Sequence, residues 1–350
     1  MSTELIDPAV APLVEHLAAA FVAREALLNQ CHAENTDAYR LFHGSVEGRV
    51  GHESGLTIDR YGEILIAQSF HNTLAPAQLD ALETFYSEVL PGLTLFYNDR
   101  SQPNSRIANT LSADEMAAAT LPRQFKELGI NYRIQARHAG QDPWLFLDMR
   151  AGRRRVLQEA EGKTVLNLFA YTCGVGIAAA KAGARLVVNV DFAESCLAIG
   201  RENVRLNELP TRPRFVKSDF FAAARQISGI GQPKFVRGRS LPPFPKLEKQ
   251  AFDLVFLDPP RHSKSLFGVV DVVNDYPALF KPALLSTAVG GTLICSNNVA
   301  EVERETWLGQ LQRSAIKAGR EVREFEWINP EADFPSLDGN PPLKMLLLRV

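Results

Sequence analysis

Three aspartates in the second half of the chain, Asp191, Asp219 and Asp258, each stand at the end of a short predicted strand. The carboxyl ends of parallel strands face the ligand crevice of an open α/β sheet, so we expect these carboxylates to line one site. Carboxylates accept hydrogen bonds, which suits Asp191 to a pair of ribose hydroxyls and Asp219 to an adenine amino group. The three acids therefore predict a site for a nucleoside.

Asp258 is followed directly by Pro259 and Pro260. Because proline fixes φ, the two rings hold the backbone after the strand in one conformation. This pattern indicates a rigid edge of carboxylate and carbonyl groups that faces a planar substrate. The alternative interpretation is a strand that the prolines simply terminate.

Residues 164–191 have the plan of a nucleotide-binding βαβ unit, with a strand, a loop holding Gly174 and Gly176, a helix and a second strand. The letters GVGIAA also fit a dinucleotide fingerprint, which leaves an NAD-dependent oxidoreductase as an alternative. However, several residues separate the first strand from Gly174, and a pyrophosphate would bind at a helix N-terminus that lacks surrounding acids. S-adenosylmethionine suits the acids better, with the backbone from Asn167 to Gly174 around its methionine end.

Asp148 and Arg150 lie just before this unit, where the chain enters the second domain and can pass over the bound ligand. Three consecutive arginines follow, Arg153, Arg154 and Arg155. We interpret these three as the solvated face of a helix start. The sequence thus separates two candidate ligand contacts from a neighbouring basic surface.

The alternation of strands and helices from residue 164 onward predicts an α/β fold, a Rossmann-like domain with a mostly parallel seven-stranded sheet. A smaller α+β domain precedes it and includes a hairpin over 55–70, whose turn we place at Asp59–Gly62. Apolar residues at helical spacing predict one amphipathic helix over 8–30. The expected domains are an N-terminal helical arm over 1–36, a small substrate-facing α+β domain over 37–150 and the Rossmann-like domain over 151–350.

The composition is that of a globular chain of 350 residues with a net charge of -2 at pH 7. This balance argues against a strongly basic surface but leaves room for a local basic patch. No apolar run reaches the ~20 residues that span a bilayer, and the N-terminus lacks a signal-peptide pattern. The four cysteines are scattered without CxxC spacing, so we expect no metal site and no disulfide framework. We expect a cytoplasmic protein without membrane contact, and the sequence leaves its oligomeric state open.

Residues 229–250 follow neither helical nor strand periodicity and are rich in basic residues. We single out Lys234, Arg237, Arg239 and Lys246, which are interleaved with phenylalanines. A basic loop with aromatic rings suits phosphate contact and base stacking, so these four are candidate RNA contacts. The sequence supports equally well the alternative of a solvated insertion.

From about residue 37 to residue 350 the chain resembles the class I methyltransferases of the bacterial large-subunit (23S) rRNA type. The matching segments are, in order, GLTIDRYGEILIAQ, LFLDMRAGRR, VLNLFAYTCG, FDLVFLDPP and ICSNN. The resemblance implies S-adenosylmethionine as cofactor, RNA as substrate and a small α/β domain before the catalytic domain. It implies cofactor contacts from the following residues: Asp148, Arg150, Asn167, Phe169, Tyr171, Asp191, Asp219 and Asp258. The family loop reads Y-T-G, so Cys173 replaces a glycine in this chain.

The target atom depends on the segment Ile294–Asn298. The cytosine-C5 branch of the family carries its nucleophilic cysteine in F-S-C-S, and alignment on the serine places Asn297 at that position. The S-N-N form resembles the branch that acts on guanine N7, whose lone pair needs orientation but no covalent step. We therefore favour guanine N7 over cytosine C5, with Asp258, Pro259 and Asn297 as the catalytic residues. Cys295 would lie on the same strand face as Asn297 and keeps cytosine C5 as the second choice.

Two further alternatives differ in class from an RNA methyltransferase. Cys173 in the cofactor loop leaves open a non-catalytic relative that binds RNA without methyl transfer. An amino-group methyltransferase of protein or DNA would also use an acid-Pro-Pro edge, but one that ends in an aromatic residue, where this chain has Arg261.

Overall fold

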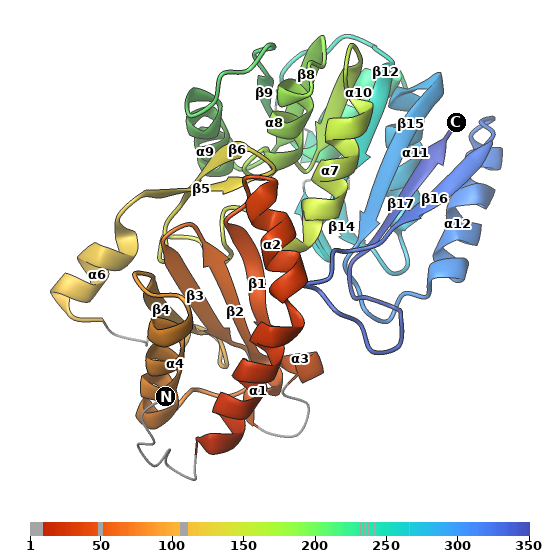
Figure 1. Ribbon diagram of the computed structural model, residues 1–350. Coiled ribbons are helices and arrows are strands. Elements are labelled where there is room, and N and C mark those ends of the chain that lie inside the picture. Colours follow the sequence, from red (N-terminus) through yellow and green to blue (C-terminus); the bar gives the residue numbers. More distant parts are fainter. Residues whose placement is uncertain are drawn as a thin grey trace. The chain divides into compact units, whose positions relative to one another are not determined.

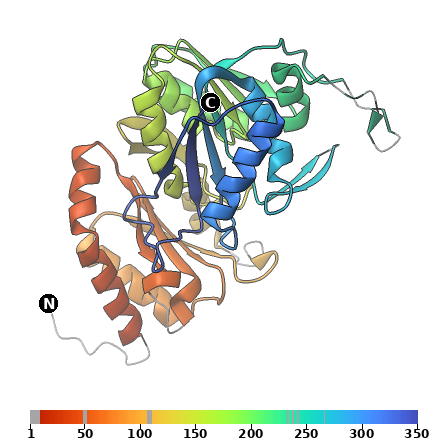
Figure 2. The ribbon, with the colours of Figure 1, turned by 90° about the vertical axis from the view of Figure 1, so that its right-hand side faces the viewer.

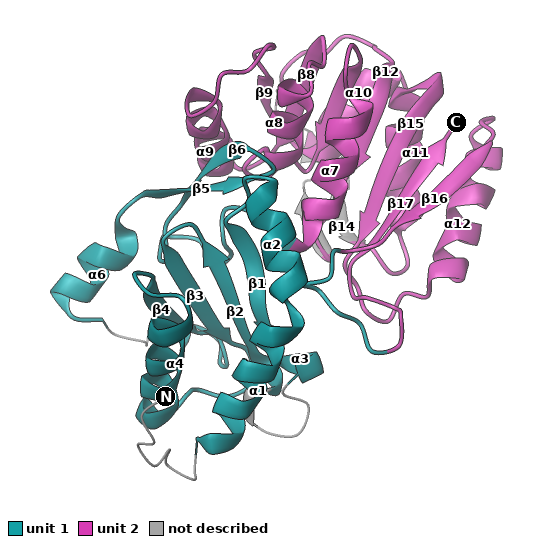
Figure 3. Cartoon of the chain, in the orientation of Figure 1, with its two compact units in different colours: residues 1–147, 331–337 teal, residues 148–330, 338–350 magenta. Residues whose placement is uncertain are grey.

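The computed structural model describes residues 10–47, 52–105, 111–231, 233, 235–236, 239–240, 243–265 and 267–350. The chain divides into two compact units, 1–147 with 331–337 and 148–330 with 338–350 (Figure 3). The expected boundary after residue 150 therefore falls just inside the second unit. The segment 331–337, although it comes late in the chain, belongs to the first unit.

The first unit contains a four-stranded sheet in the order β1-β2-β3-β4 (Figure 1). Its strands are β1 (Ala38–His43), β2 (Leu56–Tyr61), β3 (Ile64–Ser69) and β4 (Thr94–Asp99). β3 and β4 are parallel because α4 (Pro76–Val89) crosses between them, and the other pairs are antiparallel. The predicted hairpin is confirmed, but its turn comes later than expected. Asp59 lies within β2, and the chain reverses at Gly62, whose φ is +61°.

The prediction of a single helix over 8–30 is wrong, because two helices occupy this region. They are α1 (Ala11–Ala23) and α2 (Glu25–Ala33), separated at Arg24. The guanidinium of Arg24 is buried and pairs with the carboxylate of Glu47. Both helices pack into the same apolar core as β1, β2 and α4. The first unit also contains α3 (Gly44–Glu47), η1 (His52–Gly55), α6 (Ala113–Thr120), β5 (Arg123–Glu127) and β6 (Ile130–Ile134).

The second unit is built on a seven-stranded sheet in the order β16-β17-β15-β12-β7-β8-β9 (Figure 1). Its strands are β7 (Thr164–Leu168), β8 (Leu186–Asp191), β9 (Arg214–Lys217), β12 (Phe252–Leu257), β15 (Thr287–Asn297), β16 (Glu324–Ile328) and β17 (Lys344–Arg349). β17 runs antiparallel to both of its neighbours, β15 and β16, and the other pairs in this sheet are parallel. The predicted mostly parallel α/β sheet is thus confirmed.

Helices cover both faces of this sheet (Figures 1 and 2). They are α7 (Arg150–Glu159), α8 (Gly174–Lys181), α9 (Glu194–Arg205), α10 (Phe220–Ser228), α11 (Tyr276–Ser286) and α12 (Arg304–Lys317). On α7, Gly152 faces the side chains of Met345 and Phe256. The next residue along β12, Leu257, belongs to the core formed with α10, α11 and α12. Because alternate strand residues point to opposite faces, the two helix layers lie on opposite sides. Within the described part of the chain, no helix combines the length and apolarity needed to cross a bilayer.

The insertion before β12 has some order of its own. Two short strands, β10 (Phe235–Val236) and β11 (Arg239–Ser240), pair within it. The Gln226 side chain of α10 donates to the carbonyl of Pro245 at 3.0 Å and accepts from the amide of Leu247 at 3.2 Å. The end of the insertion is therefore attached to α10. A hairpin that the sequence did not predict follows Pro260, made of β13 (His262–Ser265) and β14 (Gly268–Asp271).

The four candidate RNA contacts of the insertion have different outcomes. Lys234 and Arg237 lie outside the described residues. Arg239 belongs to the short strand β11, and Lys246 is exposed.

Candidate functional site

The carboxyl ends of the parallel strands bring the predicted site residues to one edge of the second unit. Register pairs Leu257 with Leu168 and Leu168 with Val190. Asp258, the loop that starts at Phe169 and Asp191 therefore follow one another across β12, β7 and β8. The chain leaves β7 toward β8 on one side, and β12 lies on the other, so β7 is the topological switch point where open α/β sheets bind ligands.

The loop after β7 has an unusual backbone. Phe169, Tyr171 and Cys173 have φ values of 58°, 49° and 67°. Non-glycine residues in this left-handed region are strained, and such strain persists where surrounding contacts determine the conformation. Here the amide of Ala170 donates to the carbonyl of Val190 at 3.0 Å. The strained loop is thus tied to the end of β8.

Asp191 ties the same loop through its side chain. One carboxylate oxygen accepts from the amide of Tyr171 and the other from the amide of Ala193, each at 2.8 Å. Burial raises the pKa of Asp191, and hydrogen bonds from the backbone amides of Ala193, Tyr171 and Phe192 act in the opposite direction. A carboxylate offers about four acceptor positions, so these amides still leave capacity for a ligand hydroxyl.

Asn167 lies beneath α8 rather than at the edge of the sheet. Its amide nitrogen donates to the side-chain oxygen of Asn189 at 2.9 Å, and both residues are buried. A Cβ on Gly176 would lie 2.0 Å from that same oxygen. Gly176 is therefore required for the close approach of α8 to β8. The side chain of Asn167 holds this contact, and Gly174 begins the helix above it.

Asp219 lies at the start of α10, beside the residue that contacts Phe169. One carboxylate oxygen of Asp219 caps the helix by accepting from the amides of Phe221 and Ala222 at 2.8 and 3.3 Å. Phe220, the residue after Asp219, stacks on Phe169 with ring centroids 4.7 Å apart. The predicted adenine acceptor therefore lies next to an aromatic pair that reaches back to the strained loop.

Asp258 is partly exposed and accepts a hydrogen bond from the hydroxyl of Ser296. Burial of the carboxyl raises the pKa of Asp258 to about 7, and the hydrogen bond from Ser296 opposes the rise. The negative charge of Asp148 raises it further, and the positive charge of Arg153 lowers it. Asp148 thus lies near enough to Asp258 for its charge to act on that carboxyl.

Two participants escaped the sequence reasoning, Ser296 and Arg153. The interpretation of Arg153 as part of a solvated face is wrong, because it is 3% exposed and Arg150 is 0% exposed. The missed signal is the spacing, since residues three apart share one face of a helix. Arg150 and Arg153 together form the buried face of α7 beside the candidate site.

At the end of β15 the two asparagines differ. Asn297 is buried, where its amide nitrogen donates to the carbonyl of Val272 at 3.4 Å and its oxygen accepts from the amide of Val299 at 3.0 Å. These contacts fix the loop after β15. Asn298 is exposed beside it and, like Ser296, was not selected as a site residue from the sequence.

Neither cysteine at the site is placed as a nucleophile. Cys295 is buried in the core shared with α11, and burial raises the pKa of its thiol well above the usual range. Cys173 is also fully buried, and a Cβ on Gly200 of α9 would lie 2.7 Å from its sulfur. The thiol of Cys173 therefore fills the contact between the loop and α9.

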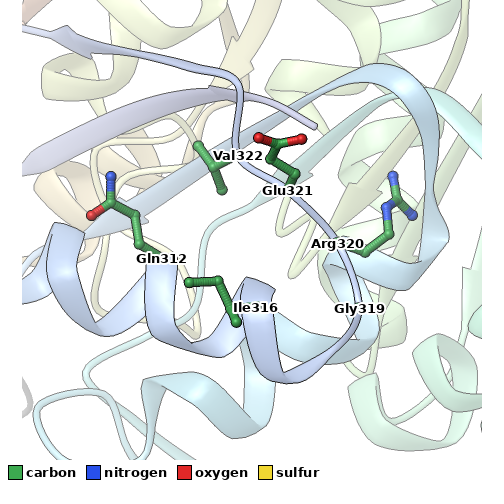
Figure 4. A pocket seen from close by; sticks show the side chains of 6 residues that line it. All are labelled: Gln312, Ile316, Gly319, Arg320, Glu321 and Val322. Atoms are coloured by element: carbon green, nitrogen blue, oxygen red, sulfur yellow. The ribbon is translucent and has the colours of Figure 1, made fainter.

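A pocket of about 510 Å³ at the end of α12 is separate from this site (Figure 4). It includes Gln312, Ile316 and Arg320. Arg320 donates to the carbonyl of Thr287 at 3.0 Å. Thr287 is the first residue of β15, so the pocket belongs to the amino end of the strand.

Known proteins resemble the chain over most of its length. Residues 39–349 match the model of the S-adenosylmethionine-dependent methyltransferases. The ribosomal RNA large subunit methyltransferase I of Shigella flexneri is 27% identical over 313 residues, which cover 88% of this chain and 72% of that protein. The protein of the same name from Escherichia coli O157:H7 is 27% identical over 312 residues, with the same shares.

Solved structures share the fold. A protein assigned as a methyltransferase and complexed with SAH has a TM-score of 0.71 at 23% identity, covering 96% of this chain and 82% of that one. A protein from Streptococcus mutans assigned as a SAM-dependent methyltransferase has a TM-score of 0.70 at 22% identity, covering 96% and 81%.

Proposed function

The chain belongs to the family of S-adenosylmethionine-dependent methyltransferases, and from this membership we propose that it methylates a base of large-subunit (23S) rRNA. The observation that carries the proposal is the carboxyl edge of the second unit. There a strained loop, held by the buried carboxylate of Asp191, adjoins the acidic edge at Asp258. The substrate class is taken from the ribosomal RNA methyltransferases that the chain is similar to.

We assign the cofactor contacts by position. The carboxylate of Asp191 accepts from the ribose hydroxyls, and Asp219 accepts from the adenine amino group beside the Phe169–Phe220 pair. The backbone from Tyr171 to Gly174 follows the methionine end. Four residues complete this set by proximity or by support of the loop: Asp148, Arg150, Asn167 and Asp258. Asn167 acts by positioning α8, since its own amide is committed to Asn189.

The substrate base lies on the edge formed by Asp258 and Pro259. When bound, the cofactor supplies an electrophilic methyl group. The site must present one atom of the base to this methyl group. Asn297 contributes by fixing the loop that carries the exposed Asn298. Orientation of two reactants alone removes a large part of such a barrier.

Guanine N7 is the target that these residues support best. Its lone pair forms the new nitrogen–carbon bond without loss of a proton. Cytosine C5 instead requires a thiolate that adds to the ring. Cys295 is the cysteine nearest to that position in sequence, and it is buried in the core. We therefore propose guanine N7, with cytosine C5 second.

RNA contacts beyond the base are assigned to the basic insertion. Lys246 is exposed at its end, and Arg239 lies in its short hairpin. Lys234 and Arg237 belong to the same proposal and lie outside the described residues.

The test is methyl transfer from labelled S-adenosylmethionine to unmodified large-subunit rRNA, with small-subunit rRNA as the control substrate. We expect label in the large-subunit RNA, a strong loss in Asp191→Asn and in Asp258→Asn, and full transfer in Cys295→Ala. Binding of both cofactor and RNA by the wild-type chain without transfer would favour the non-catalytic relative. No binding of S-adenosylmethionine would refute the site.

A further inference from the structure

A second pocket of the second unit has a strongly basic lining. It measures about 400 Å³ and is formed by the last turns of α9 and the start of β9. Its lining includes four arginines, Arg201, Arg205, Arg212 and Arg214, which we call the arginine pocket. In a chain with a net charge of -2, this concentration of positive charge is local.

The arginine pocket lies away from the carboxyl edge. β9 is the last strand of the sheet, and register pairs Arg214 with Val188 and Lys217 with Asp191. Arg214 is thus at the amino end of β9. A strand rises about 3.3 Å per residue, so the pocket begins about 10 Å along the strand from Asp191. The residues assigned to methyl transfer therefore do not include those of the arginine pocket.

Contacts hold one of the arginines in place and leave the others for a ligand. Arg201 donates to the carboxylate of Glu194 at 2.7 Å, and its guanidinium lies 5.3 Å from the ring centroid of Phe215. Arg205, Arg212 and Arg214 are exposed, and among the residues that the structure describes they make no ion pair. Like charges gathered in this way repel each other until an anion neutralises them.

We propose that the arginine pocket binds a phosphate group of the RNA backbone, which gives the substrate a second contact beyond the methyl-transfer edge. The planar guanidinium fork matches the oxygens of a phosphate in a bidentate manner. Neutralising RNA phosphates also releases counterions, which strengthens binding at low salt. This inference rests on the proposed function, because it takes RNA as the substrate.

The experiment compares two triple variants of the full chain. The pocket variant is Arg205→Gln, Arg212→Gln and Arg214→Gln. The control variant is Arg313→Gln, Lys317→Gln and Arg323→Gln, which removes the same charge from exposed positions of the same unit. Fluorescence anisotropy measures the affinity of each for a large-subunit rRNA fragment over a series of salt concentrations. Titration with S-adenosylmethionine checks that each variant keeps its cofactor site.

We expect the pocket variant to bind RNA about tenfold more weakly at moderate salt, with a log–log salt slope reduced by about 1, because the pocket is proposed to neutralise one phosphate. The control variant should retain the wild-type slope, and both should keep the wild-type affinity for S-adenosylmethionine. Equal RNA binding by the two variants overturns the proposal. If the wild-type chain transfers methyl groups to the RNA in that case, the proposed function stands and only the arginine pocket is refuted.

Inorganic phosphate separates an RNA site from a site for small anions. A phosphate-induced rise in melting temperature that is lost only in the pocket variant, together with equal RNA binding by both variants, assigns the pocket to a free phosphate and refutes the RNA contact. A loss of RNA affinity in the pocket variant, with the control variant unchanged, supports the RNA contact.

Discussion

Asp258 provides the sharpest prediction, because its charge is unfavourable for folding and is needed at the site. Burial, reinforced by Asp148, raises the pKa of Asp258 from 3.8 to about 7 in the folded chain. A rise of this size lowers the free energy of unfolding by about 4 kcal/mol at a pH where the carboxyl is ionised in both states. We predict that Asp258→Asn increases the free energy of unfolding of the second unit at pH 8 and abolishes methyl transfer.

The titration of Asp258 determines how the stability of the wild-type chain changes with pH. Below pH 3.8 the carboxyl is protonated in both states, so it contributes no pH-dependent term. As the pH rises toward 7, the unfolded chain releases the proton first, and the folded state loses stability until the folded carboxyl also ionises. Asparagine cannot titrate, and its oxygen still accepts from Ser296. The advantage of the variant should therefore grow with pH, by up to about 4 kcal/mol between acid and pH 8.

Asp253, at the other end of β12, is the matched control. Burial alone would raise the pKa of Asp253, but hydrogen bonds from Thr164 and the charge of Arg185 lower it overall. Asp253→Asn should thus be less stable than the wild type at neutral pH, whereas Asp258→Asn should be more stable. The assay is urea unfolding of the three proteins across this pH range. A difference between Asp258→Asn and wild type that stays constant with pH would refute the raised pKa of Asp258, and full methyl transfer by the variant would refute its role in the reaction.

Three further predictions follow from the packing. Gly176→Ala places a Cβ 2.0 Å from the side-chain oxygen of Asn189, so it should destabilise the chain by about 2–4 kcal/mol. Asn189→Ala in the same chain should relieve part of that loss. Urea-unfolding free energies that are additive for the two substitutions would contradict the contact. Hydrogen bonds from Arg349 lower the pKa of Glu159 to about 2, so Glu159 stabilises the fold above its unfolded pKa of 4.5 and less as the pH falls. Glu159→Gln should therefore lower the free energy of unfolding by about 1 kcal/mol at pH 7, a value reduced for solvent screening. An equal loss at acid pH would exclude the Glu159–Arg349 ion pair as the cause. Cys295→Ala should lower the melting temperature while leaving the turnover number unchanged. Loss of turnover in a folded variant would support a covalent step through Cys295.

Local patterns were sufficient to predict the strands of the seven-stranded sheet and the edge that carries the site. The apolar runs before Asp191 and Asp258 have strand length, and parallel strands necessarily end at one edge. The position of Cys295 on the same strand face as Asn297 also follows from alternation, and both side chains are buried. These features depend on neighbours in sequence, which periodicity describes well.

Features that depend on register or on distant segments could not be predicted. The sequence predicts Asn167 as part of the cofactor site but does not show its partner, because pairing of β7 with β8 places it opposite Asn189 and only the register reveals this. The strained φ values of the loop depend on contacts with β8. The segment 331–337 belongs to the first unit although β16 and β17 flank it, which no local pattern in the sequence indicates.

The central claim is methyl transfer to a base nitrogen of large-subunit rRNA without a covalent cysteine step. It is tested most directly by mass spectrometry of nucleosides from that RNA after incubation with the chain and isotope-labelled S-adenosylmethionine. We predict labelled 7-methylguanosine, equally with the wild type and with Cys295→Ala. Labelled 5-methylcytidine that disappears with Cys295→Ala would contradict the claim.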